Sequence, residues 1–385
     1  MKILHVVPTY FPAVRYGGPI YSVHGLAAGQ AALGHQVSVF TTNADGAGVS
    51  DVPLATTVAM DGVAVTYFPV DKPRRLYRSP ALGRALKAQA SEFDFIHLHS
   101  VFLWPTLVAA RAARRAGTPF VLSPRGMLVG ELIRSKSRAI KSAWLTLFER
   151  RTIREAAAIH FTAALEARDF AKMGLTARAE ILIPNGVEVP RDASADAISF
   201  DVGTATASPG FALYLGRLNW KKNLVALIDS LHFAPNTTLV IVGTDDEGHS
   251  VDLRNAISAA GVDARVVLIA RNIEGADKEW LFARCGLFVL PSLNENFGNT
   301  VLEAMTRGKP VVVSSGAGVA DVVRDSDCGL IADPTPDALG RAINILADDA
   351  DRAIKMGANG RRAAREHFGW RAIATRMVEA YAQLK

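Results

Sequence analysis

The stretch that decides the fold is residues 290–316, LPSLNENFGNTVLEAMTRGKPVVVSSG. Its apolar residues recur at the spacing of one helix face, which predicts a helix over 299–307. Gly308, followed by a proline two positions later, is a typical signal for the end of that helix. Apolar runs at 287–291 and 310–314 predict a buried strand on each side. A strand, a loop, a helix and a second strand in this order indicate an α/β fold.

Two glutamates stand eight positions apart in this stretch. Glu295 lies just outside the expected helix N-terminus, and Glu303 lies just over one turn inside it. Backbone N–H groups near Gly298 would point at an anion placed there, and a glycine would let that anion approach the backbone closely. One carboxylate could bind ribose hydroxyls and the other the hydroxyls of a second sugar. The arrangement suits a sugar nucleotide; the alternative is an ordinary amphipathic helix with two exposed acids.

The same stretch, from Ser292 to Val312, resembles the large family of retaining GT-B glycosyltransferases, family 4 in the usual classification. The resemblance covers nearly the whole chain. It implies two doubly wound, Rossmann-like α/β domains that face each other across a cleft. It also implies that Glu295 faces the transferred sugar and that Glu303 holds the ribose. Donor binding is implied for four further residues as well: Asn296, Phe297, Gly298 and Asn299.

Length and composition agree with a two-domain globular protein. A chain of 385 residues is too long for a typical single core. No apolar run reaches the roughly 18 residues needed to span a bilayer, and the N-terminus reads as a first buried strand, not as a signal peptide. The two cysteines, Cys285 and Cys328, have no metal-binding or redox spacing. We therefore expect both to be reduced in a cytoplasmic protein.

The positive charge is concentrated in the first half of the chain. Residues 1–190 hold 22 Lys and Arg against 13 Asp and Glu, whereas residues 191–385 hold 21 against 24. The partner of the first half should therefore be anionic. Because the sequence shows no nucleic-acid module and no interleaved aromatic platform, nucleic acid is not expected. An anionic membrane surface, at the inner face of the membrane, or an anionic acceptor is favoured.

Domain borders follow from a change of composition. Residues 191–210 are rich in Ala, Ser, Asp and Pro, which predicts a linker. The first domain, 1–190, would bind the acceptor, and the second, 211–367, would bind the nucleotide sugar. By resemblance, a final helix over 368–385 returns to the first domain.

A glycine pair follows the first predicted strand. Gly17 and Gly18 lie in a loop before the first helix, as in a nucleotide-binding βαβ unit. The chain has neither the G-x-G-x-x-G fingerprint nor a P-loop, so the pair by itself is a weak signal. The resemblance implies that both glycines lie against the donor phosphates.

Two histidines end the strand predicted over 95–99. On a strand His97 and His99 face the same side. No neighbouring Asp, Cys or third His completes a metal site, so no metal is expected there. His99, at the carboxyl end of a parallel strand, is a candidate for lining the acceptor cleft.

The run Ser123 to Met127, SPRGM, carries an arginine where many members of the family have a histidine near the donor sugar. Arg125 cannot act as a general base at pH 7 because its pKa exceeds about 12. It could bind a phosphate or an anionic acceptor. The alternative is a surface arginine in a turn.

A second anion site is predicted at the start of the second domain. Residues 216–223, GRLNWKKN, follow a strand and open a helix. Glycine, two cations five positions apart and a helix start form a diphosphate-binding arrangement. By resemblance Arg217 and Lys222 grip the two phosphates, which would make a metal ion unnecessary. Lys221 is the less suitable lysine because the family's lysine stands five positions after the arginine.

An amphipathic, basic helix is predicted over 135–157. Its apolar face includes Ile140, Trp144 and Leu147, and arginines supply most of its charge. One interpretation is a surface helix packed on the sheet. The other is an interfacial helix that touches anionic lipid.

Together with these features, the resemblance implies a retaining glycosyltransferase that needs no metal or other cofactor. It would move a sugar from a nucleotide diphospho-sugar to a hydroxyl of a saccharide or lipid-linked acceptor, in bacterial surface polysaccharide or glycolipid synthesis. The expected catalytic residues are Glu295, Arg217, Lys222 and Arg125. The alternatives are a nucleotide-sugar epimerase of the same fold and a non-enzymatic protein that binds sugar nucleotides.

Overall fold

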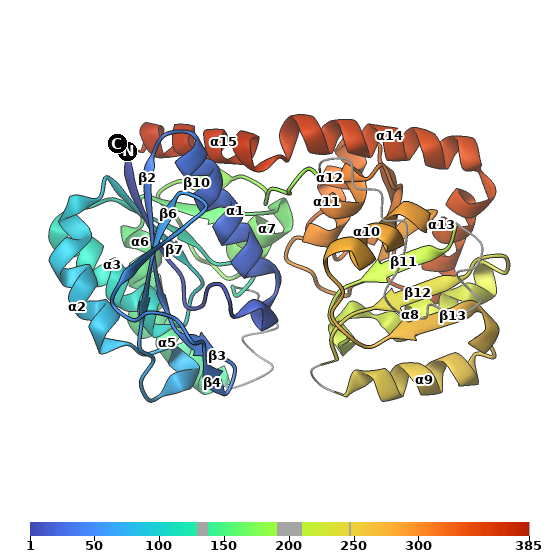
Figure 1. Ribbon diagram of the computed structural model, residues 1–385, viewed down its shortest axis with the longest axis horizontal. Helices are drawn as coiled ribbons and strands as arrows, with labels where there is room; N and C mark the ends of the chain where they lie inside the picture. The colour runs from blue at the N-terminus through green and yellow to red at the C-terminus, as the bar shows by residue number, and fades with distance from the viewer. Residues whose placement is uncertain (129–137, 191–209, 246–247, 385) are drawn as a thin grey trace. The chain divides into compact units, whose positions relative to one another are not determined.

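The computed structural model describes residues 1–128, 138–190, 210–245 and 248–384 (Figure 1). The chain divides into two compact units, each built on its own sheet. Unit 1 comprises Met1–Gly186 and Trp370–Lys385, and unit 2 comprises Val187–Gly369. The fold class predicted from the sequence is confirmed, since both units are Rossmann-like α/β domains.

Unit 1 is built on an eight-stranded sheet with the order β10-β9-β8-β7-β1-β2-β6-β5. All neighbouring strands are parallel except β5 and β6. The strands β7, β8 and β9 are buried along their whole length, which agrees with their mostly apolar sequences. The strands are β1 (Lys2–Val6), β2 (Gln36–Thr42), β5 (Thr57–Met60), β6 (Val63–Phe68), β7 (Phe95–His99), β8 (Phe120–Ser123), β9 (Ala158–Phe161) and β10 (Glu180–Leu182).

A short hairpin and several helices complete unit 1. The hairpin, β3 (Ala44–Asp45) with β4 (Gly48–Val49), lies in the segment after β2. The helix predicted over 135–157 contains, within the described residues, a π-helical stretch at Leu145–Glu149 between two α-helices. The α-helices are α1 (Gly18–Ala32), α2 (Pro80–Gln89), α3 (Trp104–Ala116), α5 (Arg138–Trp144), α6 (Arg150–Glu155), α7 (Ala164–Lys172) and α15 (Trp370–Gln383).

The last helix of the chain packs against α1 through a tryptophan. The sequence predicted a final helix over 368–385, and the structure has α15 at Trp370–Gln383, separated by two residues from α14, which ends at His367. The Trp370 ring lies so close to Gly25 that a Cβ built there would come within 2.0 Å of it. The break between the helices thus lets Trp370 fill a space that requires glycine on α1.

Unit 2 is built on a six-stranded, fully parallel sheet with the order β13-β12-β11-β14-β15-β16. The strands are β11 (Ala212–Leu215), β12 (Leu239–Val242), β13 (Val266–Ile269), β14 (Leu287–Leu290), β15 (Val311–Ser314) and β16 (Gly329–Ala332). The helices are α8 (Leu224–Asp229), α9 (His249–Ala259), α10 (Gly275–Arg284), α11 (Asn299–Thr306), α12 (Ala320–Asp325), α13 (Pro336–Asp348) and α14 (Ala350–His367).

In each sheet the strand order reverses at one strand, β1 in unit 1 and β11 in unit 2. In open α/β sheets ligands bind outside the carboxyl ends of the strands near such a point. The residues after β7, β8, β11 and β14 are therefore placed where a substrate can reach them. Among the described helices, none combines the length and the apolar character that crossing a bilayer requires.

Candidate active site

The loop between β14 and α11 is held in one conformation by backbone hydrogen bonds. The N–H of Glu295 donates to the carbonyl of Gly316 at 3.1 Å, and its own carbonyl accepts from the N–H of Gly318 at 2.9 Å. Gly298, just before α11, has a φ of 106°, in the left-handed region that favours glycine. A Cβ at this position would approach the Leu290 side chain to 2.7 Å. The loop therefore presents Glu295 from a rigid support.

Two predicted catalytic residues meet in this loop. The Nζ of Lys222 and a carboxylate oxygen of Glu295 form an ion pair, with 16% and 20% of the two side chains exposed. Asn223, which adopts a φ of 56°, donates from Nδ2 to the carbonyls of Pro291 (3.2 Å) and Pro334 (2.9 Å). Asn223 thus fastens the Lys222 segment to the loop that carries Glu295, although the two are 73 positions apart in sequence.

Arg217 lies in the same loop after β11, but the structure does not bring it to Glu295. Its side chain is exposed, and its carbonyl accepts a hydrogen bond of 2.9 Å from the hydroxyl of Tyr214. The neighbouring Lys221 lies over the Trp220 ring, with Nζ 5.7 Å from the ring centroid. Lys222, not Lys221, is therefore the lysine beside Glu295.

The residues after Glu295 differ in how deeply their side chains are buried. Phe297 has only 3% of its surface exposed, and its carbonyl accepts from the N–H of Val319 at 2.8 Å. Its ring is part of the core, so a bound donor could meet its backbone only. Asn296 and Asn299 are half-buried, on either side of it, and Asn299 begins α11.

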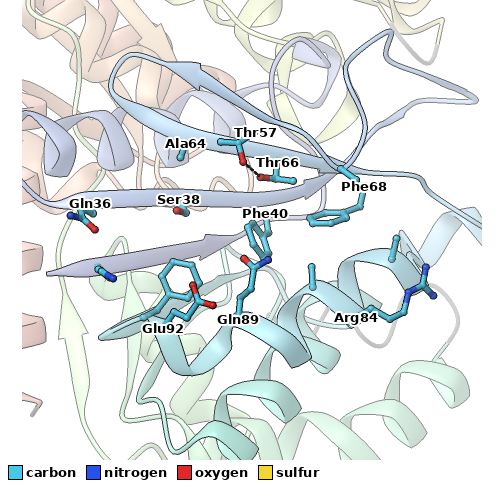
Figure 2. A pocket seen from close by; sticks show the side chains of 15 residues that line it. Gln36, Ser38, Phe40, Thr57, Ala64, Thr66, Phe68, Arg84, Gln89 and Glu92 are labelled. Carbon is cyan, nitrogen blue, oxygen red and sulfur yellow. Dashed lines mark hydrogen bonds between the residues drawn. The ribbon is translucent and has the colours of Figure 1, made fainter.

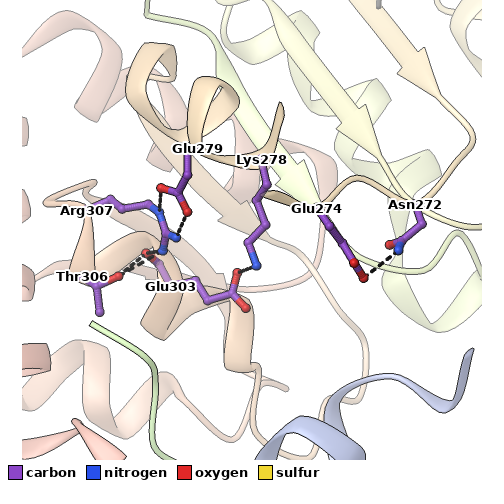
Figure 3. A network of polar contacts seen from close by, with 7 residues as sticks. All are labelled: Asn272, Glu274, Lys278, Glu279, Glu303, Thr306 and Arg307. Carbon is purple, nitrogen blue, oxygen red and sulfur yellow. Dashed lines mark hydrogen bonds and ion pairs between the residues drawn. The ribbon is translucent and has the colours of Figure 1, made fainter. Parts of the chain in front are cut away.

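Glu303 belongs to a polar network between α10 and α11 (Figure 3). Its carboxylate pairs with the Nζ of Lys278 at 2.6 Å. Beside it Arg307 forms a two-point ion pair with Glu279 and donates to the carbonyl of Glu303 at 2.9 Å. Sequence analysis missed Lys278, because nothing in its surroundings marks it and it lies 25 positions before Glu303.

In unit 1 the structure brings Arg125 and His99 together. Arg125 follows β8 and donates from Nη2 to Nδ1 of His99 at 3.2 Å and from Nη1 to Oδ1 of Asn185 at 2.8 Å. Its φ of 56° turns the backbone at the end of the strand. The alternative interpretation, a plain surface arginine, is wrong, because the guanidinium is inside a network of polar side chains.

Arg125 determines which ring nitrogen of His99 carries the proton, and therefore which atoms donate in the hydrogen bonds that follow. A guanidinium only donates, so Nδ1 of His99 accepts, and the proton of this neutral ring is on Nε2. That Nε2–H donates to Nδ1 of His5 at 2.9 Å. The remaining N–H of His5 then donates to Oε1 of Gln30 at 2.8 Å. The result is a chain of side chains with one direction, from Arg125 through His99 and His5 to Gln30, which we call the histidine chain.

The structure places a third histidine, His5, beside His97 and His99, whereas the sequence predicted that no third histidine lies there. His5 pairs in register with His97 across the parallel strands β1 and β7, and candidate ligand nitrogens of His5, His97 and His99 lie within 4.8 Å of one another. The hydrogen bonds nevertheless oppose a metal. If Nε2 of His99 bound an ion, Nδ1 would carry the proton and meet the N–H of Arg125. The trio fits a hydrogen-bonded core better than a metal centre.

Burial keeps the four fully buried histidines of unit 1 neutral. It lowers the pKa of His5 to about 4 and that of His160 to about 3, with the charge of Arg125 acting in the same direction. The pKa values of His97 and His99 are also lowered well below 6.5, first by burial and then by the neighbouring histidines and Arg125. Burial lowers the pKa of Arg125 to about 10, so it stays charged at pH 7.

The predicted glycine pair lies at the start of α1. Gly17 has a φ of 72°, and Gly18 is the first residue of the helix. A Cβ at Gly17 would meet nothing within 4 Å, so this position needs glycine for its backbone conformation and not for lack of space.

The basic helical segment contains a buried acid that sequence analysis did not identify. One oxygen of Glu149 accepts from the backbone N–H of Phe102 (2.7 Å) and from Nε1 of Trp144 (2.9 Å). Trp144 is therefore turned inward, while Ile140 and Leu147 are 63% and 66% exposed. The predicted apolar face is real, but it is divided between the core and the surface.

A cavity of about 590 Å³ lies elsewhere in unit 1, between the outer strands and α2 (Figure 2). Phe40, Phe68 and Phe93 line it together with polar side chains such as Ser38 and Gln89. None of the residues predicted for the active site lines this cavity.

Comparisons with known proteins agree with the two-domain architecture. The family described as "Glycosyl transferase 4-like domain" matches residues 17–186, and "Glycosyl transferases group 1" matches residues 198–363. The chain belongs to the GT-B glycosyltransferases. It is thus a transferase enzyme.

The relatives of this glycosyltransferase are named for different reactions. The chain is 32% identical to the O-antigen chain mannosyltransferase B of Escherichia coli over 177 residues, which is 45% of each chain. It is 28% identical to the D-inositol 3-phosphate glycosyltransferase of Xylanimonas cellulosilytica, covering 100% of this chain and 96% of the relative. The match to the first of these relatives thus spans less than half of that protein.

A solved structure supports the fold. The Anabaena protein HepE, in complex with UDP and glucose, superimposes with a TM-score of 0.73 at 21% identity, covering 100% of both chains.

Proposed function

We propose that this glycosyltransferase moves a sugar from a nucleotide diphospho-sugar to an acceptor hydroxyl and retains the anomeric configuration. The observation that carries the proposal is the Lys222–Glu295 ion pair on the rigid loop before α11. A cation and a carboxylate, side by side at a helix N-terminus, match the needs of a departing diphosphate and of the positively charged sugar it leaves. The epimerase alternative is less favoured, since the relatives are named as transferases.

Each residue has a distinct part in the proposed reaction. As the bond to the diphosphate breaks, Lys222 and the exposed Arg217 stabilise the growing negative charge. Glu295 stabilises the positive charge on the sugar, and Glu303, released from Lys278, accepts hydrogen bonds from the ribose. We assign no protein nucleophile; the acceptor hydroxyl attacks on the face that the leaving group vacates and passes its proton to an oxygen of the departing diphosphate.

The proposed acceptor is a saccharide or a lipid-linked saccharide of a bacterial surface polysaccharide or glycolipid. One relative, from Xanthomonas campestris, is named GDP-mannose:cellobiosyl-diphosphopolyprenol alpha-mannosyltransferase and matches 99% of this chain at 25% identity. The O-antigen mannosyltransferase points to the same class of product.

A ligand screen followed by a turnover assay tests the proposed function. The thermal unfolding temperature should rise with one of UDP, GDP or ADP, and the matching sugar nucleotide should be consumed when an acceptor is added. NMR of the product should show the anomeric configuration of the donor. Conversion of the donor without an acceptor would indicate an epimerase, and binding without any conversion would indicate a non-enzymatic protein.

Turnover should not depend on a metal ion, because Lys222 and Arg217 supply the positive charge at the leaving group. We expect the initial rate in excess EDTA to equal the rate in untreated buffer. Loss of turnover in EDTA that is restored by Mg²⁺ or Mn²⁺ would contradict this prediction.

Unit 1 should bind anionic membranes reversibly through the helical segment 138–155. Ile140 and Leu147 are exposed there beside the exposed side chains of Arg150, Arg151 and Arg154. Each cation near an anionic surface contributes about 1 kcal/mol. Flotation at low salt should show binding to vesicles with anionic lipid, and high salt should reverse it.

A pair of variants distinguishes binding through this surface from nonspecific binding to vesicles. Leu147→Glu should reduce flotation, whereas Ile354→Glu, on α14 of unit 2 where Ile354 is 70% exposed, should not. Equal binding to neutral vesicles, or an equal effect of both variants, would count against this surface.

A further inference from the structure

Arg125 is a cation whose polar partners in the described part of the chain are both neutral. The guanidinium has five N–H donors. One on Nη1 is bonded to Asn185 and one on Nη2 to His99, while Nε has no hydrogen-bond partner. Three donors therefore remain, and Arg125 keeps part of its surface exposed. Such a fork matches the oxygens of a phosphate or a carboxylate.

The nearby carboxylate of Glu166 is directed elsewhere. One oxygen accepts from the N–H of Gly126 at 2.6 Å, and the other accepts from the N–H of Thr162 at 2.9 Å and from its hydroxyl at 3.1 Å. Glu166 thus braces the loop after β8; its charge opposes the lowering of the Arg125 pKa by burial, but the two side chains form no ion pair. A buried charge is normally paired with an opposite charge, but the guanidinium of Arg125 has no ion-pair partner among the described residues.

The surrounding side chains hold the guanidinium in place without neutralising it. The histidine chain has one direction, so His99 can only accept from Arg125, and His5 and Gln30 keep His99 in that tautomer. Asn185 fixes the other end of the fork. This arrangement holds a charged guanidinium in a defined orientation, at the carboxyl edge of the sheet where substrates bind.

We propose that Arg125 receives an oxyanion, a phosphate or a carboxylate, that is carried by the acceptor. The proposal rests on the proposed function and names its acceptor class as anionic. The donor diphosphate is assigned to Arg217 and Lys222 of unit 2, which leaves Arg125 of unit 1 for the other substrate. Arg125 is then a substrate-binding residue, and His99 and Asn185 are positioning residues.

The histidine rings provide a direct readout of an anion at Arg125. NMR spectra that resolve the ring nitrogens are recorded during titration of the whole protein with sodium phosphate, and separately with sodium acetate, at constant ionic strength. We expect a saturable shift of Nδ1 of His99. Arg125→Gln should weaken the apparent affinity at least tenfold, whereas Arg178→Gln, at an exposed arginine of unit 1, should leave it unchanged.

An isosteric variant tests the proposal without removing the arginine. Asn185→Asp places a carboxylate on Nη1, which should neutralise Arg125 from within and weaken anion binding at least tenfold while the thermal unfolding temperature is kept or raised. A purely structural contact would leave anion binding unaffected. Saturation by phosphate alone assigns a phosphate, and saturation by acetate alone assigns a carboxylate.

The proposal is overturned if neither anion produces a saturable shift at His99, or if Asn185→Asp binds them as the wild type does. These outcomes are separate from a failure of the proposed function. Binding of UDP or GDP to Arg217 and Lys222 is measured by calorimetry, and Arg217→Ala should abolish that binding while the phosphate titration at His99 stays the same.

Discussion

Glu295→Gln should lower kcat by about ten- to over a hundred-fold and leave the affinity for the free nucleoside diphosphate close to that of the wild type. Glu295 is proposed to face the sugar, whose positive charge grows as the leaving group departs, so its effect belongs to the transition state. A charged hydrogen bond in a closed site is worth roughly 1.5–3 kcal/mol, which corresponds to that range of rates.

Glu303→Gln is the matched control, because the same chemical change is made on the other carboxylate. It should weaken the nucleotide directly, since Glu303 is proposed to hold the ribose equally in the ground and transition states. Steady-state kinetics and calorimetry with the free nucleoside diphosphate measure both effects. The two roles have been interchanged if Glu295→Gln weakens the nucleotide and Glu303→Gln does not.

The ion pairs add a structural check on these variants. Glu295 is paired with Lys222 and Glu303 with Lys278, so each amide removes one ion pair inside unit 2. The side chains are only partly exposed, and loss of either pair should cost a similar amount of stability. Equal changes in thermal unfolding temperature, with unequal changes in kcat, would therefore show that the kinetic difference comes from catalysis.

Unit 1 should lose stability steeply as the pH falls below about 6.5. The pKa of His5 is lowered by burial to about 4 and that of His160 to about 3, so the unfolded chain binds these protons first. Their stabilising contribution is therefore complete above the unfolded value and is lost as the pH falls towards the folded value. Each histidine should remove about 1.4 kcal/mol of unfolding free energy per pH unit in its window.

Two buried glutamates change the unfolding free energy of unit 1 in the opposite direction as the pH falls, so their effect must be distinguished from that of the histidines. Burial raises the pKa values of Glu149 and Glu166, so their contribution increases as the pH falls. Hydrogen exchange of peptides from unit 1 and unit 2, measured between pH 7.5 and pH 4.5, reports each unit on its own. The exchange free energy of unit 1 is expected to show the steeper dependence.

One substitution isolates a single histidine. In His160→Gln the side-chain amide can still donate to the carbonyl of Ile183, as Nε2 of His160 does at 2.8 Å, but it cannot titrate. The pH dependence of unit 1 should become shallower by about 1.4 kcal/mol per pH unit below pH 6.5. His232→Gln, at an exposed histidine of unit 2, is the control. Identical slopes for the wild type and His160→Gln would refute this assignment.

Several features of the site could be predicted because they are encoded in short stretches. The segment around Glu295 carries its own strand, glycine turn and helix, so local spacing was enough to place the carboxylate before α11. The resemblance selected Lys222 over Lys221 as the lysine for a donor phosphate, which stays a prediction, and the structure pairs Lys222 with Glu295. The helix boundaries were less certain, as the break before Trp370 shows.

The features that were missed depend on contacts between distant segments. Lys278 reaches Glu303 from another helix, and Glu149 holds Phe102 from 47 positions away. His5 meets His99 because β1 lies next to β7 in the sheet, although the two histidines are 94 positions apart. No periodicity within either strand indicates this register.

The sequence by itself determined the α/β class, the two-unit division and the segments that carry the reactive side chains, because each follows from apolar periodicity and turn residues over a few neighbours. Only the tertiary structure decided the state of those side chains. Which carboxylate pairs with which lysine, and whether Arg125 lies on the surface or at the end of the histidine chain, depend on strand order and register. These are set by packing of the whole unit, since hydrogen bonds form between atoms that are neighbours in space and not in sequence.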